Sequence, residues 1–181
     1  MDERKWIERI LAGDTQSFSC LVAKYEKMAY TIALRILENR EEAEEAVQDA
    51  FVKMYRALSD FHFDSKFSTW FYRIVYRTAL TALRQQRMFV SYEEAGPVDL
   101  SNDEVESATA LLEREDRKEM IARTLKKLPA DEALLLTLYY LEECSVEEIC
   151  QITELSASNV KVKLFRGRKR FYEVLQDKMK L

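Results

Sequence analysis

The chain of 181 residues has few of the residue types on which catalytic and metal centres usually depend. It contains one histidine, His62, and only three glycines and two prolines. A single histidine argues against a histidine-based metal centre, and the sequence has no Gly-rich phosphate-binding loop. It also shows no Ser/His/Asp spacing and no cluster of metal-ligand type. We therefore expect a protein that is not an enzyme and that uses neither a cofactor nor a metal.

Cysteines and long hydrophobic runs are also scarce. Cys20, Cys144 and Cys150 form no CxxC pair, and all three lie in apolar helical contexts. This pattern favours reduced, partly buried thiols over a disulfide or a zinc site, and it leaves a redox role for Cys144 and Cys150 open. No signal peptide and no apolar run of roughly 18 residues is present. We expect a cytoplasmic protein without membrane insertion.

The scarcity of helix-breaking residues predicts an all-α fold. Amphipathic patterns indicate helices over residues 1–11, 17–37, 41–58, 67–87, 111–128, 131–141 and 146–153, and a last helix that opens at Ser156 or Ser158 and reaches residue 175. Between them, the polar stretch around Gly96 and Pro97 is rich in carboxylates, which is typical of a flexible acidic linker. The sequence thus predicts two helical domains, residues 1–88 and 111–181, joined by a linker at 89–110.

The stretch 145–175 has the pattern of a helix-turn-helix motif. Two helical patterns flank a polar break, and the second lies in the position of a recognition helix. Within it, Val160, Leu164, Gly167 and Phe171 share one face at steps of three or four residues. We expect this face to be buried, with Gly167 allowing the first helix of the motif to pack closely.

The opposite face of this last helix is strongly basic. Val162 and Phe165 lie among the cations Lys161, Lys163, Arg166, Arg168, Lys169 and Arg170. Such an arc suits a phosphate backbone, because each contact releases condensed counterions, and an aromatic ring can touch a base edge or a thymine methyl. The alternative is a solvated basic helix with Phe165 packed on a neighbour. We favour contact with duplex DNA.

A net charge of −4 is unusual for a DNA-binding protein, and it predicts weak binding to naked DNA and a need for a partner. Much of the acidity lies in the helix at 41–58, in Glu41, Glu42, Glu44, Glu45 and Asp49. Early carboxylates suit the helix dipole, but carboxylates four residues apart repel each other. The composition alone leaves a basic partner surface and a solvated face equally open.

Aromatic and basic residues alternate in the segment that follows. The loop at 60–66 carries Phe61 and Phe63, which suit either stacking on unpaired bases or closing the end of a helical bundle. In the next helix Arg73, Arg77 and Arg84 line up, with Tyr72 and Tyr76 beside them. Basic side chains that can bind phosphates, interleaved with aromatic rings that can stack on bases, indicate contact with single-stranded DNA. The alternative is a solvated face.

Four stretches together resemble the sigma-70 family of bacterial RNA polymerase sigma factors, of the extracytoplasmic function (ECF, group four) type. They are EEAEEAVQDAFVKMYRAL (41–58), KFSTWFYRIVYRTALTALRQQR (66–87), LKKLPADEALLLTLYYLEECSVEEIC (125–150) and SASNVKVKLFRGRKRF (156–171). They cover nearly the whole chain in family order and spacing. The resemblance implies a region 2 bundle, a region 4 helix-turn-helix, and a role in initiating transcription of a stress or envelope-response regulon.

The resemblance also assigns roles to residues. It implies polymerase contacts by Glu45, Gln48, Asp49 and Val52. It implies contacts with the −10 element, including a base flipped into the loop, by Phe61, Phe63, Ser65, Lys66, Arg73, Arg77 and Arg84. It implies contacts with the −35 element by Ser158, Asn159, Lys161, Val162, Lys163, Phe165, Arg166 and Lys169. The expected partners are core RNA polymerase, promoter DNA and an anti-sigma factor, with the acidic linker threading the polymerase channel.

The chain departs from the family pattern at a few positions. It has Arg77 where many relatives carry asparagine, Val162 where they carry a small polar or basic residue, and Glu45-Ala46 in place of an Asp-Leu pair. These differences bear on the promoter sequence rather than on the class.

The competing interpretation is a stand-alone helix-turn-helix regulator whose N-terminal domain senses a ligand or dimerises. The negative net charge argues against it, since such a regulator must bind duplex DNA unaided.

Overall fold

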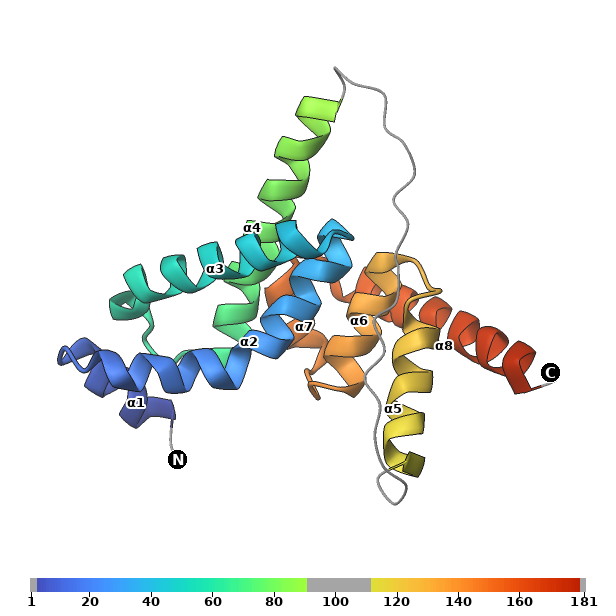
Figure 1. Cartoon of the computed structure of the whole chain (residues 1–181), viewed down its shortest axis with the longest axis horizontal. Helices are drawn as coiled ribbons and strands as arrows, with labels where there is room; N and C mark the ends of the chain where they lie inside the picture. The colour runs from blue at the N-terminus through green and yellow to red at the C-terminus, as the bar shows by residue number, and fades with distance from the viewer. Residues whose placement is uncertain (1–2, 91–111, 180–181) are drawn as a thin grey trace.

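The computed structural model describes residues 3–90 and 112–179, and these residues form helices without any strand. The elements in order are α1 (Glu3–Leu11), α2 (Thr15–Leu37), α3 (Arg40–Arg56), the 3-10 turn η1 (Leu58–Asp60), α4 (Phe67–Val90), α5 (Leu112–Leu125), α6 (Ala130–Tyr140), α7 (Val146–Thr153) and α8 (Ala157–Met179) (Figure 1). The predicted all-α fold is confirmed. Residues 89–90 of the predicted linker belong to α4, and its remainder lies outside the described residues.

Short polar side chains set the starts of several helices. The Asp14 carboxylate accepts the backbone N–H groups of Gln16 and Ser17 at the start of α2. Asn39 accepts the N–H of Glu42 at the start of α3. Ser145 and Glu148 form a reciprocal capping box on α7, as expected for Ser followed three residues later by Glu. At the start of α8 the Ser156 hydroxyl accepts the N–H of Asn159 at 3.4 Å, so Ser156 is the capping serine.

The N-terminal half is a bundle of α2, α3 and α4 around an aromatic centre. The fully buried Phe71 contacts Phe51 and Tyr25, with ring centroids 4.8 Å and 6.0 Å away. Buried aromatic pairs add about 0.5–1.5 kcal/mol each beyond the burial of their area. This centre fixes the distance between α3 and α4, whose outer faces carry the predicted contact residues.

In the C-terminal half, α8 packs on α6, which is buried along most of its length. The closest approach is at Gly167, where an added Cβ would lie 3.2 Å from Leu136 Cδ1 and 3.3 Å from Glu132 Cβ. The prediction that Gly167 permits close packing is therefore correct, but the neighbour is wrong. The approaching helix is α6 and not α7, the first helix of the motif.

The two halves pack directly against each other. Helix α4 lies along α7, and α2 contacts α6 (Figure 1). Their buried apolar side chains join in one continuous core. Because α7 is the first helix of the helix-turn-helix motif, this packing brings the predicted duplex-binding half against the predicted single-strand-binding helix.

Candidate nucleic-acid interface

Helix α8 is amphipathic in the way the sequence predicts. Val160, Leu164 and Gly167 are buried and Phe171 is half-buried. The turn before α8 passes through Glu154 in the left-handed region (φ 63°), whose N–H bonds to the carbonyl of Cys150. This turn fixes the angle between α7 and α8, so that the outer face of α8 points away from the body of the protein.

The exposed face of α8 combines apolar and basic side chains. Phe165 is 65% exposed and Val162 is 46% exposed, so the alternative of a Phe165 packed on a neighbour is wrong for this structure. The other exposed residues predicted to contact the −35 element are Ser158, Asn159, Lys161, Arg166 and Lys169. Tyr172 is also 65% exposed, and the sequence reasoning missed it. Its position seven residues after Phe165 was the available signal, since residues seven apart share a helix face.

Three cations of α8 turn back toward α6 instead. Lys163 forms an ion pair with Asp131, Arg170 pairs with Glu132 at 3.3 Å, and Arg168 donates to the Tyr140 hydroxyl at 3.4 Å. Burial alone would raise the pKa of Asp131, but the hydrogen bond from Lys163 holds that pKa below its usual range. Lys163, which the resemblance assigns to DNA, is therefore engaged with the body of the protein.

Cations on α4 and in the loop before it face carboxylates of the C-terminal half. Lys66 Nζ lies 2.9 Å from Glu148 Oε1. Arg77 Nε donates to Glu154 Oε1 at 2.9 Å, and Arg73 Nη2 lies 3.4 Å from the same oxygen. The hydrogen bond from Arg77 is the main cause of the lowered pKa of Glu154. Arg84 is exposed and has no carboxylate partner among the described residues.

The two phenylalanines of the loop at 60–66 have different roles. Phe61 is 6% exposed and packs on Phe67 and Trp70, with centroids 5.4 Å and 5.0 Å away, so its ring closes the end of the bundle. Phe63 is 38% exposed, has a φ of 61°, and lies under the Arg4 guanidinium at 4.4 Å. The bundle-closing alternative therefore holds for Phe61, whereas base stacking by Phe63 stays a prediction. Phe63 is the loop phenylalanine with an accessible ring.

The tyrosines of α4 do not flank the arginines as open stacking surfaces. Tyr72 is 3% exposed, and its hydroxyl donates to Glu142 Oε2 at 2.9 Å. Burial and the nearby Glu142 carboxylate raise the pKa of Tyr72. Tyr76 is half-buried. The prediction that Tyr72 lies beside the arginines for base stacking is therefore wrong for this structure.

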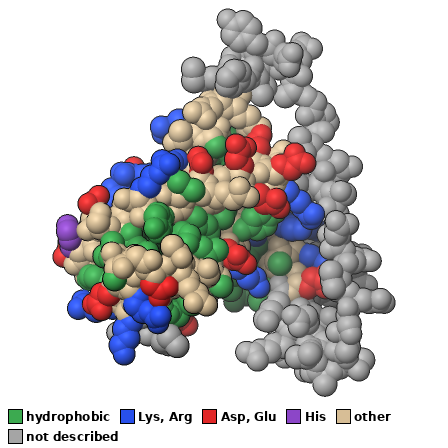
Figure 2. Space-filling model, turned by 60° about the vertical axis from the view of Figure 1, so that its left-hand side comes forward, with side chains coloured by type: hydrophobic (Ala, Val, Ile, Leu, Met, Phe, Trp, Pro, Cys, Tyr) green, Lys and Arg blue, Asp and Glu red, His purple; other side chains and the backbone are tan. Residues whose placement is uncertain are grey.

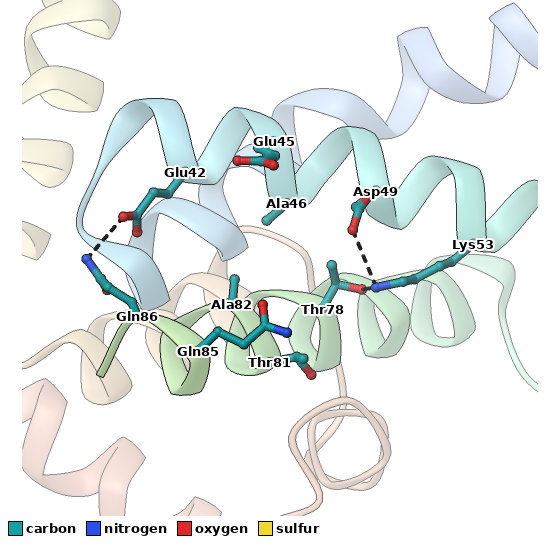
Figure 3. Close-up of a pocket in the computed structure, with 10 residues that line it drawn as sticks. All are labelled: Glu42, Glu45, Ala46, Asp49, Lys53, Thr78, Thr81, Ala82, Gln85 and Gln86. Carbon is teal, nitrogen blue, oxygen red and sulfur yellow. Dashed lines mark hydrogen bonds and ion pairs between the residues drawn. The ribbon is translucent and has the colours of Figure 1, made fainter. Parts of the chain in front are cut away.

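A groove of about 300 Å³ separates the acidic face of α3 from α4 (Figure 3). Glu42 accepts from Gln86 at 3.1 Å, and Lys53 contacts both Asp49 (3.7 Å) and the Thr78 hydroxyl (3.3 Å). Along the outer side of α3, Glu45, Gln48 and Val52 recur at helical spacing and are exposed. In the view of Figure 2, carboxylate side chains gather toward the upper edge of the described surface and hydrophobic ones lie across its centre.

The remaining predictions concern cysteines, metals and membranes. Cys144 is buried, and burial raises the pKa of its thiol to about 11. The cysteines are unpaired, and no group of three or more metal-ligating side chains occurs in the described ranges 3–90 and 112–179. Within those ranges no helix has the length and apolarity needed to cross a membrane.

Comparison with known proteins agrees with a DNA-binding factor built from a helical bundle and a helix-turn-helix. The family model Sigma-70 region 2 matches residues 21–88, and Sigma-70, region 4 matches residues 118–171. The RNA polymerase sigma-H factor of Pseudomonas aeruginosa is 32% identical over 181 residues, covering 96% of this chain and 94% of the relative. The ECF RNA polymerase sigma-E factor of Escherichia coli is 31% identical over 169 residues, covering 90% and 88%.

Solved structures show the same fold at lower identity. CnrH in complex with the cytosolic domain of CnrY has a TM-score of 0.63 at 21% identity and covers 97% of each chain. The sigma factor RpoE in complex with the anti-sigma factor NepR from Bartonella quintana has a TM-score of 0.72 at 18% identity, covering 89% of this chain and 98% of that one.

The class that emerges is a promoter-recognising transcription initiation factor that is not an enzyme. The chain belongs to the sigma-70 family of RNA polymerase sigma factors, and its curated relatives include members of the ECF type. The resemblance found in the sequence is confirmed, and a stand-alone regulator is not supported.

Proposed function

We propose that this chain directs core RNA polymerase to promoters through two separate DNA contacts, one by α8 and one by α4 with its preceding loop. The observation that carries this proposal is the outer face of α8. Two exposed apolar side chains, Val162 and Phe165, stand among exposed cations on a helix whose other face is buried. A helix of this kind presents both phosphate contacts and base contacts to a major groove.

At the −35 element, Lys161, Arg166 and Lys169 supply the charge. Val162 and Phe165 would contact thymine methyl groups, and Ser158 and Asn159 lie at the N-terminal turn, where backbone N–H groups favour a phosphate. Lys163 has a lesser part, because its ammonium is already paired with Asp131.

At the −10 element, the proposed strand path runs over Lys66, Arg73, Arg77 and Arg84. Phe63 offers an accessible ring for stacking, and the half-buried Ser65 stands beside it in the loop that would hold a flipped base. Phe61 supports this loop from inside the bundle.

Core polymerase would dock on α3 through Glu45, Gln48, Asp49 and Val52, which requires a basic partner surface with an apolar centre. We assign the first domain, which continues to the end of α4 at Val90, to polymerase and −10 binding, residues 91–110 to a linker, and residues 111–181 to −35 binding. An anti-sigma factor is proposed as a further partner, because the similar RpoE was solved with one. The chain would act where the polymerase is, in the cytoplasm.

The test is run-off transcription with core polymerase on a genomic fragment library, with and without this chain. The expected result is a set of new transcripts that share two upstream elements. A chain carrying Lys161→Ala and Arg166→Ala serves as the matched control and should lose those transcripts. No new transcripts, together with tight duplex binding by the chain alone, would instead support a stand-alone regulator.

A further inference from the structure

Phe63, in the loop at 60–66, has a backbone conformation that a phenylalanine rarely adopts. Its φ is 61°, in the left-handed region, where the Cβ of an L-residue crowds the following carbonyl oxygen. A bulky residue keeps such a conformation only where its surroundings hold it there, and residues of this kind gather at binding sites. The contacts of Phe63 therefore bear on the function of the loop.

Two neighbours hold the ring of Phe63. The ring of Phe61 has its centroid 4.8 Å away, and Phe61 is itself buried against Trp70. The guanidinium carbon of Arg4 lies over the Phe63 ring, 4.4 Å from its centroid. At this distance the cation is attracted to the electron-rich face of the ring. The ring is still 38% exposed, so part of it stays open to a ligand.

Arg4 belongs to a helix that is anchored in the bundle. Helix α1 lies along α2, and it contacts η1, the turn that leads into the loop (Figure 1). Ile7 and Ile10 of α1 are buried. Glu3, directly before Arg4, accepts from the hydroxyl of the buried Tyr25. The backbone that carries the guanidinium is therefore fixed relative to the loop.

We propose that Arg4 is a positioning residue of the loop at 60–66, which together with Phe61 holds the ring of Phe63 ready to stack on the flipped base. The inference rests on the proposed function, which places the flipped base in this loop. It extends the −10 site to α1, to which the proposed function gives no part. A ring that is already fixed loses little freedom when a base stacks on it, so the base binds more tightly.

The experiment measures how much the flipped base contributes to binding. It uses the holoenzyme and a single-stranded oligonucleotide with the −10 sequence that run-off transcription identifies. An abasic site, a sugar without its base, is placed at one position of the strand after another. The measured quantity is the ratio of two affinities, that for the intact strand over that for the abasic strand. Contacts with the DNA backbone cancel in this ratio, whereas stacking on the missing base does not.

In the parent chain one position should stand out, where removal of the base lowers affinity about tenfold. Arg4→Ala should reduce the ratio at that position roughly two- to fivefold, the value of an exposed cation–π contact. Lys5→Ala, the control, removes an exposed cation from the next residue of α1 and should keep the parent ratio. An unchanged ratio in Arg4→Ala, or an equal loss of affinity for both strands, would overturn the positioning role.

Phe63→Ala separates a failure of this inference from a failure of the proposed function. It should remove most of the ratio, and adding Arg4→Ala should then change the ratio no further, because both residues act through one contact. If Phe63→Ala lowers the ratio but Arg4→Ala does not, only the role of Arg4 fails. If Phe63→Ala keeps the parent ratio, the proposed stacking on Phe63 fails, and the role of Arg4 fails with it. Circular dichroism checks that each variant is folded.

Discussion

Lys161 and Lys163 are the same residue type two positions apart, yet they face different surroundings. Two residues of an α-helix turn the side chain through about 200°. Lys161 is exposed on the outer side of α8, whereas Lys163 pairs with Asp131 of α6. Lys161 is therefore the proposed DNA contact, whereas Lys163 helps to hold α8 against α6.

The first prediction uses this pair. For the polymerase holoenzyme on a promoter fragment, Lys161→Ala should weaken binding and reduce the slope of log affinity against log salt by about one, the value of one phosphate contact. Lys163→Ala should leave the slope unchanged and lower stability by at most about 1 kcal/mol, as for a surface ion pair. The measurement is filter binding across a salt series. An equal loss of slope in both variants would contradict the division of α8 into two faces.

The second prediction concerns the cysteines. A thiolate, and not a thiol, reacts with alkylating reagents, so a raised pKa slows the reaction at neutral pH. With the pKa of Cys144 raised to about 11 by burial, we expect Cys144 to react at least about tenfold more slowly than the exposed Cys20. Mass spectrometry after timed iodoacetamide treatment measures both rates. In urea the two rates should converge, and similar rates in the folded chain would refute the burial of Cys144.

At the scale of elements, the packing of α8 on α6 depends on Gly167. An added Cβ would meet Leu136 Cδ1, which can move, and Glu132 Cβ, which is held by the helix backbone. The two helices would have to separate by a few tenths of an ångström to admit it. Glycine is otherwise costly in a helix, by about 1 kcal/mol relative to alanine. At position 167 the close approach of the two helices therefore favours glycine, whereas helix propensity favours alanine.

The third prediction is that Gly167→Ala lowers the free energy of unfolding by about 1–2 kcal/mol, because overpacking outweighs the gain in helix propensity. The control is Gln176→Ala, an exposed position of the same helix, which should change stability by less than about 0.5 kcal/mol. Urea unfolding followed by circular dichroism supplies both values. A stabilised Gly167→Ala chain would show that α6 and α8 can separate at little cost.

Much of the secondary structure could be predicted from the sequence. Helical periodicity predicted every α-helix and the buried stripe of α8. Periodicity assigns a residue to a face but does not say which helix meets that face. For that reason α7 was wrongly expected to pack at Gly167, and Tyr72 was wrongly expected to lie on an open face. The burial of Phe61 and the exposure of Phe63 also depend on backbone geometry, since Phe63 takes a left-handed conformation.

The fourth prediction tests the outer face of α3. Replacing Gln48 and Asp49 by alanine should reduce assembly with core polymerase about tenfold while the helical content stays constant, because interface hot spots cost more than 1 kcal/mol each. Glu8→Ala on α1 removes an exposed carboxylate elsewhere and serves as the control. Competition for core polymerase against a labelled parent chain gives the affinities. Equal competition by all three chains would remove α3 from the interface.

At the scale of the whole molecule, the basic side chains of this acidic protein fall into two sets with different surroundings. The net charge is −4, and the packing of the two halves pairs Lys66, Arg73 and Arg77 with carboxylates of the C-terminal half. The charge that would attract a single strand is thereby neutralised internally. The cations on the outer face of α8 remain exposed. The contacts that link sequence-distant helices α4 and α7 could not be predicted from local patterns, since no periodicity encodes them.

The last prediction follows from the ionisation of the groups between the halves. Burial raises the pKa of Glu148, but the N–H of Ser145 and the ammonium of Lys66 outweigh it and lower the pKa overall. The hydrogen bond from Arg77 lowers the pKa of Glu154, and the bond to Glu148 raises the pKa of Lys66. Lowered carboxyl pKa values stabilise the packing of the two halves above the ordinary value of 4.5, and this contribution is lost as pH falls through the lowered values.

The raised pKa of Lys66 acts with the opposite sign: it stabilises the packing of the two halves below the ordinary value of 10.5, and this contribution is lost as pH rises through the raised value. We therefore expect the radius of gyration to be constant from about pH 5 to about pH 10 and to grow outside that window. Scattering across a pH series, with circular dichroism to confirm that the helices persist, measures it. The Glu148→Gln and Glu154→Gln chain should lack the acid transition, because neither position can then gain a proton. An acid transition of the same size in that chain would mean that other carboxylates hold the two halves together.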